Sequence, residues 1–106
     1  MISFEEFKKL ELKVAVIKSA EDHPNANKLT VMKIDVGGQE KQIVAGIRGH
    51  YRNEDLVGKK IVVVNNLEPA KLRGVESNGM LLAAVEGDRV VLLVPDKDVS
   101  PGASVQ

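Results

Sequence analysis

Short apolar segments recur along this chain at a regular spacing, and turn residues separate them. The segments are Leu12–Ile17, Leu29–Val36, Lys41–Ile47, Lys60–Asn66, Gly79–Val85 and Val90–Val94. This spacing predicts an all-β fold, either a sandwich or a small barrel. One helical turn through Leu56, capped by Asn53, is expected between the third and fourth segments. An OB-fold barrel of five strands, with Val90–Val94 as an extra C-terminal strand, fits this order best.

The two ends of the chain are predicted to pack on the barrel. Ser3 and Glu6 form a capping box, which starts a short helix at Phe4–Leu10 with both phenylalanines on its apolar side. Such a short helix is marginal alone, so we expect it to dock on the barrel. The tail after Pro95 is expected to be irregular, with Val99 and Val105 packed against the rest of the chain.

Length and composition indicate one soluble domain over residues 1–106. The chain has no cysteine, which excludes disulfides and thiolate metal sites. No apolar run approaches the roughly 20 residues that span a bilayer. The acidic, helical start is unlike a signal peptide, so a cytoplasmic protein without membrane association is expected.

No residue pattern in the chain predicts catalysis. His23 and His50 lie in different loops, without carboxylates at metal-ligand spacing. Ser77 has no nearby base, and Gly74 and Gly79 do not form a phosphate-binding loop. The chain is therefore expected to be no enzyme and to need neither a metal nor another cofactor.

A basic loop indicates a binding role instead. The net charge is zero, but residues 23–80 carry nine Lys and Arg against six Asp and Glu. Within the loop "NNLEPAKLRGVESNGMLLAA", Lys71 and Arg73 are two residues apart and would point the same way if the loop is extended. Asn66 and Ser77 add neutral polar groups of the kind that contact phosphate and sugar. A solvated loop tip with local turn hydrogen bonds explains the same residues equally well.

The few aromatic residues restrict the kind of nucleic acid that could be bound. Phe4, Phe7 and Tyr51 are the only aromatics, whereas readers of unstructured single strands stack bases on several aromatic rings. An RNA ligand is therefore expected to be recognised by its folded shape. Met80 could cover one exposed base.

Several segments together resemble the tRNA-binding domain family, whose members include domains of methionyl-tRNA synthetases and free-standing tRNA-binding proteins. The segments are "DHPNANKLTVMKIDVG", "VAGI", "YRNEDLVGKKIVVVNNLEPAKLRGVESNGMLLAA" and "PDKDV". The resemblance implies an OB-fold that binds the outer corner of tRNA largely independently of base sequence. The positions it implies for the binding surface are Lys28, Asn66, Lys71, Arg73, Ser77 and Met80.

We therefore expect a non-catalytic module that delivers or retains tRNA for an aminoacyl-tRNA synthetase. Among these enzymes, methionyl-tRNA synthetase is the one that the resemblance favours. The expected partners are tRNA, a second copy of the chain and a methionyl-tRNA synthetase catalytic chain or domain. The homodimer is implied by the resemblance and also by surplus apolar surface, because Lys60–Asn66 and Val90–Val94 are apolar on both faces. The alternative is a chaperone-like or signalling module that uses the same barrel to bind protein.

Overall fold

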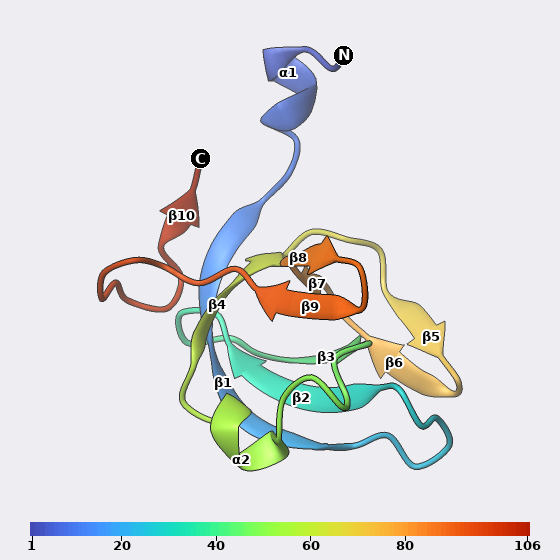
Figure 1. The fold of residues 1–106 in the computed structure, drawn as a ribbon. Coiled ribbons are helices and arrows are strands. Elements are labelled where there is room, and N and C mark those ends of the chain that lie inside the picture. The colour runs from blue at the N-terminus through green and yellow to red at the C-terminus, as the bar shows by residue number, and fades with distance from the viewer.

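The computed structural model describes all of residues 1–106 and consists of short strands wound into a small barrel (Figure 1). The elements are α1 (Phe4–Phe7), β1 (Leu12–Asp22), β2 (Thr30–Asp35), β3 (Glu40–Ala45), α2 (Asn53–Leu56), β4 (Lys60–Val64), β5 (Ala70–Leu72), β6 (Val75–Ser77), β7 (Met80–Leu81), β8 (Ala83–Glu86), β9 (Arg89–Leu92) and β10 (Ser104–Val105). No helix has the length and apolar character needed to cross a membrane.

One long strand, β1, organises the barrel. The strand order is β3-β2-β1-β4-β7, and β10 also pairs with β1. The predicted strand ended at Ile17, but β1 continues to Asp22 because a register shift between Ile17 and Ser19 bends it. Its first half can therefore pair with β4 while its second half pairs with β2. This sharing of one bent strand between two neighbours curls the sheet into a nearly closed barrel.

A single apolar core fills this barrel. Ile17, Met32, Ile43 and Ile61 lie in it with at most 1% of their surface exposed. They come from β1, β2, β3 and β4, whose inward positions follow the alternation seen in the sequence. The predicted OB-like barrel, with a small N-terminal helix and additional strands, is confirmed.

The C-terminal half differs from the prediction in how its strands pair. The expected strand at Gly79–Val85 is divided, with β7 on β4 and β8 in a separate hairpin with β9. The backbone N–H of Leu82, between β7 and β8, still donates to Val62 in β4. After Leu82 the strands no longer pair with the main sheet, and β9 pairs with β8, although Leu92 of β9 still reaches the core and Leu93 accepts from the backbone N–H of Val62.

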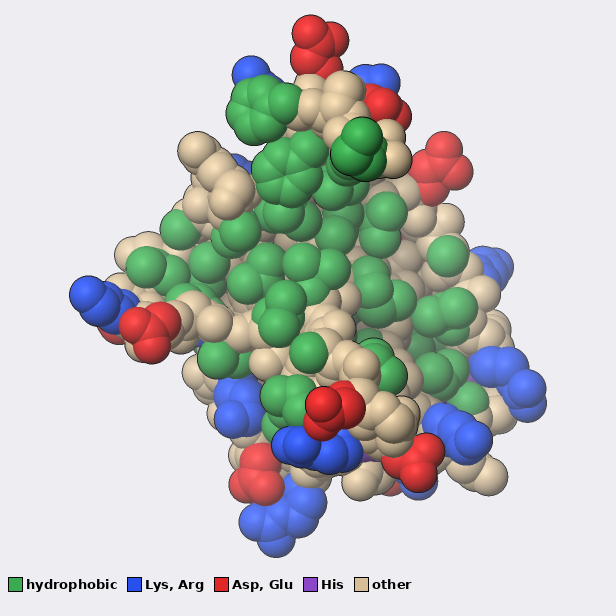
Figure 2. All heavy atoms as spheres, turned by 45° about the horizontal axis from the view of Figure 1, so that its top comes forward, with side chains coloured by type: hydrophobic (Ala, Val, Ile, Leu, Met, Phe, Trp, Pro, Cys, Tyr) green, Lys and Arg blue, Asp and Glu red, His purple; other side chains and the backbone are tan.

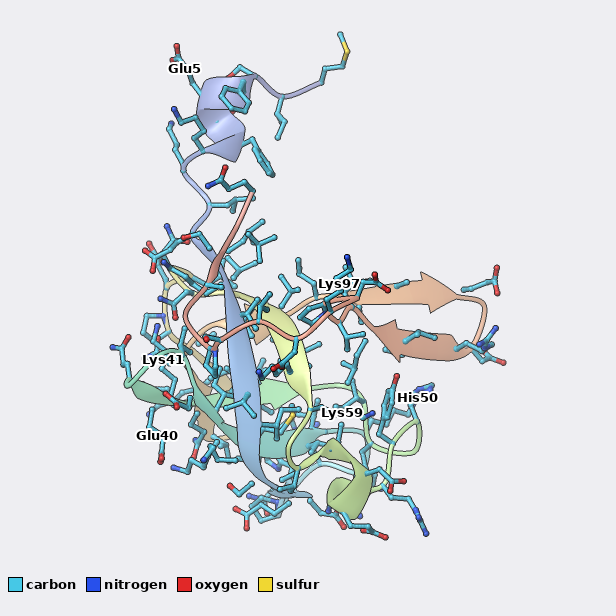
Figure 3. All side chains as sticks on the ribbon, turned by 90° about the vertical axis from the view of Figure 1, so that its left-hand side faces the viewer. Glu5, Glu40, Lys41, His50, Lys59 and Lys97 are labelled. Carbon is cyan, nitrogen blue, oxygen red and sulfur yellow. The ribbon has the colours of Figure 1, made fainter.

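The N-terminal helix begins at the predicted residue but ends at Phe7 rather than Leu10, and it does not dock on the barrel. The capping box of Ser3 and Glu6 is present, yet no residue of α1 is buried and Phe4 is 71% exposed. The expectation that both phenylalanines pack into the barrel is therefore wrong within this chain. Figure 3 shows α1, with Glu5 on it, standing clear of the barrel. The segment between α1 and β1 extends away from the barrel, which leaves the apolar side of α1 uncovered.

The second helix and the tail agree with the prediction more closely. Helix α2 ends at Leu56, as expected, and buries this residue. Arg52, not Asn53, occupies the N-cap, and the Asn53 side chain donates to Asp22 at 3.1 Å. In the tail, β10 pairs with the start of β1 and Val105 is half-buried, as expected. Val99, which was expected to pack as well, is 38% exposed, so that part of the prediction is wrong within this chain.

Candidate nucleic-acid interface

The expected loop between β4 and β7 contains a small hairpin. Strands β5 and β6 pair with Lys71 opposite Glu76, and Arg73 and Gly74 form the turn. Both turn residues have positive φ, 53° for Arg73 and 90° for Gly74. The expectation that Lys71 and Arg73 point the same way assumed one extended segment. Lys71 lies in β5 but Arg73 lies in the turn with positive φ, so this expectation is wrong. Both side chains remain exposed on one hairpin.

The conformation of Arg73 is unusual for its residue type. It is the only residue other than glycine with positive φ in this chain. A side chain with a Cβ is strained there, and hairpin turns of this shape normally use Asn, Asp or Gly. Backbone strain that persists is a common feature of functional positions. The strain therefore points to the Arg73 guanidinium as a group with a use on the surface.

The loop between β1 and β2 lies beside the tip of this hairpin (Figure 1). His23 Nε2 lies 2.8 Å from the backbone oxygen of Leu72, and Arg73 Nη2 lies 3.5 Å from that of Asn25. Arg48 supports the loop from the other side by donating to Ala26 at 3.2 Å. Two segments far apart in the sequence therefore meet at one corner of the molecule.

An open cleft of about 390 Å³ lies where the loop and hairpin meet. It is lined by Asn25, Ala26, Asn27, Lys28, Leu29 and Arg73. Lys28 and Arg73 bring positive charge to the cleft, and the two asparagines bring neutral hydrogen-bonding groups. This combination suits a phosphate with its attached sugar.

Arg73 differs from the other arginines in having no acidic partner: Arg48 pairs with Asp22, Arg52 with Asp55 and Glu54, and Arg89 with Glu86. Lys28 and Lys71 are also free of salt bridges, as is every lysine of the chain except Lys60, which pairs with Asp98. Unpaired cations can interact with a phosphate without first breaking an ion pair.

Arg52 illustrates the paired state. The hydrogen bond that the guanidinium donates to Asp55, the charge of Asp55 and the charge of Glu54 raise the pKa of Arg52. Its guanidinium is thus held by carboxylates beside its own helix. We therefore exclude Arg52 from the candidate interface and retain Lys28, Lys71 and Arg73.

Asn66 lies away from this corner, beneath the N-terminal helix. Its side-chain oxygen accepts from the backbone N–H of Glu11 and its nitrogen donates to the backbone oxygen of Lys9, both at 2.8 Å. Both halves of its amide therefore hold the segment between α1 and β1.

Ser77 and Met80 also lie apart from the charged cleft. Ser77 is 3% exposed; its hydroxyl accepts from Val44 at 3.0 Å and donates to Gly79 at 2.9 Å. Met80 is half-buried in β7 and packs against the core. Of the six expected positions, the structure brings Lys28 and Arg73 together on the cleft and places Lys71 on the same hairpin as Arg73. Asn66, Ser77 and Met80 lie apart from the cleft.

Sequence reasoning missed His23 and Arg48, which hold the β1–β2 loop in place. His23 lies in a loop, as the sequence indicates, but it is 3% exposed and both of its ring nitrogens are in use. Its partner Leu72 is 49 residues away. A pattern confined to neighbouring residues contains no signal for such a contact.

Comparison with known proteins agrees with the barrel fold. The family described as "Putative tRNA binding domain" matches residues 12–104. The chain belongs to the tRNA-binding domain family. Methionine–tRNA ligase of Pyrococcus furiosus, for example, is 53% identical over 105 residues, which is 99% of this chain. The chain spans 14% of the length of that ligase.

Solved structures in this family cover the whole chain. A MetRS-related protein from Pyrococcus horikoshii superposes with a TM-score of 0.93 at 39% identity, covering 100% of this chain and 98% of its own. The chaperone CsaA from Bacillus anthracis superposes with a TM-score of 0.91 at 34% identity, covering 100% and 99%. The same barrel is thus found in a MetRS-related protein and in a chaperone. The fold alone therefore does not distinguish their roles, and the residues on its surface must do so.

Proposed function

We propose that this chain is a non-catalytic module that binds folded tRNA and delivers or retains it for an aminoacyl-tRNA synthetase, in particular methionyl-tRNA synthetase. The observation that carries this proposal is the cleft between the β1–β2 loop and the β5–β6 hairpin, which Lys28 and Arg73 line together, with Lys71 exposed on the same hairpin. Family membership and the likeness to methionine–tRNA ligase support both the ligand and the enzyme.

The proposed mechanism is tethering. A module that binds tRNA with modest affinity raises the tRNA concentration near a catalytic unit to which it is joined or docked. Phosphate contacts suffice for this task, because the catalytic unit can select the tRNA species. We place this role in the cytoplasm.

Recognition by shape follows from what surrounds the cleft. No aromatic residue lines it. The hydroxyl of Tyr51, the only aromatic residue outside the N-terminal helix, accepts from the backbone N–H of Leu92 at 3.1 Å. Without a stacking surface the cleft is suited to the backbone of folded RNA and not to splayed single-stranded bases.

The test is tRNA binding over a range of salt concentrations. Replacing Lys71 and Arg73 together with Ala should reduce the slope of log K against log salt by about 1–2, at about 0.7–0.9 per lost phosphate contact. Arg89→Ala is the matched control, because Arg89 is paired with Glu86 on the distant β8–β9 hairpin. An unchanged slope in the double variant would place the phosphate contacts elsewhere.

The rival function is binding of unfolded protein, and the likeness to the chaperone CsaA favours it. Competition distinguishes the two functions. An unfolded peptide should not displace tRNA, and single-stranded RNA of equal length should displace it less well than unlabelled tRNA. Displacement by the peptide at both low and high salt would support the chaperone-like function.

We further infer that a second copy of the chain covers the exposed apolar surface. Figure 2 shows an apolar face that begins at α1 and continues over the barrel, with charged side chains around it. Exposed members include Ile2 at 67%, Phe4 at 71% and Leu10 at 44%. A groove of about 690 Å³ lies between α1 and β10, and its apolar lining includes Phe7 and Val105. Two-fold pairing is the commonest way for identical chains to bury such a surface.

A further inference from the structure

His23 is the buried side chain that the proposed function does not yet use. It is one of only three buried polar side chains, with Thr30 and Ser77. Its Nδ1 lies 2.9 Å from the backbone nitrogen of Asn25, and its Nε2 lies 2.8 Å from the backbone oxygen of Leu72. An N–H donor at Nδ1 and an oxygen acceptor at Nε2 require the neutral ring with its proton on Nε2. The ring therefore accepts a bond from its own loop and donates one to the β5–β6 hairpin.

The β5–β6 hairpin has few other attachments near its tip. It forms a sheet of its own, separate from the barrel sheet. Its remaining hydrogen bonds to the barrel come from the end of β6 and the residue after it, through Glu76, Ser77 and Asn78 to β3. Close to the turn, the only hydrogen bonds to another segment are the one between His23 and Leu72 and the long one from Arg73 to Asn25. An isolated two-stranded hairpin is marginally stable, so an anchor at this end restricts its movement.

The anchored residue directly precedes the strained one. Leu72, which accepts from His23, is followed by Arg73 with its positive φ. Fixing the Leu72 carbonyl also fixes the start of the turn, and therefore the direction in which the guanidinium leaves the backbone. The same imidazole fixes Asn25, which lines the cleft together with Lys28.

We propose that His23 is a positioning residue for tRNA binding, which holds Arg73 of the hairpin and Lys28 of the β1–β2 loop on the same cleft. This inference rests on the proposed function. Two long, flexible cations bind a phosphate more tightly when their backbones are already in place, because less conformational entropy is lost on binding. His23 supplies that preorganisation without touching the RNA.

Two isosteres separate the two bonds of the ring. In His23→Asn the amide overlaps the position of Nδ1, so the bond to Asn25 can form but Leu72 is out of reach. In His23→Gln the terminal nitrogen overlaps Nε2 and can still donate to Leu72. We expect H23N to weaken tRNA binding about five- to tenfold and to reduce the salt slope by about 1, the value for one phosphate contact. H23Q should stay within about twofold of wild type with an unchanged slope.

A double-mutant cycle tests whether His23 acts through Arg73. In an Arg73→Ala background, H23N should cause almost no additional loss, because its effect passes through the guanidinium that is already absent. Equal losses in H23N and H23Q, or a loss in H23N that adds fully to that of R73A, would overturn the proposal and leave His23 with a general structural role. Thermal unfolding of each variant is measured alongside.

The wild-type protein provides a test that does not depend on whether the variants fold. Nitrogen chemical shifts of the imidazole should show the proton on Nε2 both in free protein and in the tRNA complex, since the bridge must persist when RNA binds. A proton on Nδ1 in either state would overturn the inference. Failure of wild type to bind tRNA would overturn the proposed function as well. Normal binding by wild type with a loss in R73A but none in H23N would overturn this inference alone.

Discussion

The hydroxyl of Ser77 accepts a hydrogen bond from the backbone N–H of Val44, at 3.0 Å, across the seam where the barrel closes. It also donates to the backbone oxygen of Gly79 at 2.9 Å. Strand β3 is an edge of the main sheet, and the neighbouring N–H of Asn78 donates to Gln42 in the same strand. The Ser77 side chain thus takes the place of part of the backbone hydrogen bonding that would otherwise join the two edge strands, β3 and β7.

Replacement of Ser77 with Ala should therefore lower the free energy of unfolding by about 1–3 kcal/mol, because it leaves a buried backbone N–H without its partner. Urea unfolding measures this change. Ser19→Ala is the matched control, since Ser19 is exposed on β1, and it should change stability by less than about 0.5 kcal/mol. Full stability combined with lost tRNA binding would instead make Ser77 a direct RNA contact.

Arg73→Asn should change stability and binding in opposite directions. Asn adopts positive φ more readily than Arg, so relief of strain at this turn should stabilise the fold by roughly 0.5–1 kcal/mol. Loss of the guanidinium should weaken tRNA binding and reduce the salt slope by about 0.7–0.9. Urea unfolding and filter binding on one preparation measure both effects.

Arg73→Lys provides the control for charge. It keeps a cation in the same strained backbone, so it should leave stability near that of wild type and retain most of the salt slope. If R73N binds tRNA as wild type does, the strain at Arg73 has no connection with RNA.

Asn66→Ala should release the N-terminal helix without altering the phosphate contacts. The variant removes the two side-chain bonds from Asn66 to the segment between α1 and β1, at Lys9 and Glu11. The two bonds from Asn65 to Glu11 remain, so the segment should loosen at Lys9 first. Limited proteolysis with trypsin should cut after Lys8 or Lys9 faster than in wild type. The salt slope of tRNA binding should not change, whereas a fall of about 0.7–0.9 would indicate that Asn66 positions a phosphate-binding cation.

The barrel was predictable from the sequence because its determinants are local. Alternating apolar residues specify β2 and β3, and the glycines at 37 and 38 both adopt the positive φ that their turn requires, 75° and 93°. The short helix α2 was likewise found from a few adjacent residues. Such features need only periodicity and turn chemistry.

The remaining features depend on contacts between distant residues. The β5–β6 hairpin was missed because each strand has only three residues and the turn has Arg where Asn or Asp is usual. The placement of Asn66 depends on Glu11, 55 residues away, and that of Ser77 on Val44, 33 residues away. The residue types of Asn66 and Ser77 suggest polar groups for binding. In the structure each of these side chains already has hydrogen-bond partners within the fold.

The exposed side of α1 leads to the last prediction, which concerns the homodimer. A solitary two-turn or shorter helix is unstable in water, so Phe4 and Leu10 need a partner surface beyond their own chain. Sedimentation equilibrium of wild type should give about twice the chain mass of 11.5 kDa at micromolar concentration. Phe4→Ser with Leu10→Ser should shift the protein toward monomer by more than about tenfold in dissociation constant, because burial of each large apolar side chain contributes roughly 1.5–3 kcal/mol.

Val57→Ser is the matched control for this dimer, because Val57 is 49% exposed but follows α2, far from α1 on the barrel (Figure 1). It should leave the mass of the dimer unchanged. In the F4S/L10S monomer each cleft should still contact phosphates, because Lys28, Lys71 and Arg73 lie away from α1. If both copies of the dimer contact one tRNA molecule, the monomer should bind tRNA more weakly than the dimer does. Wild type that sediments as a monomer at tens of micromolar would show that a different partner covers the apolar face.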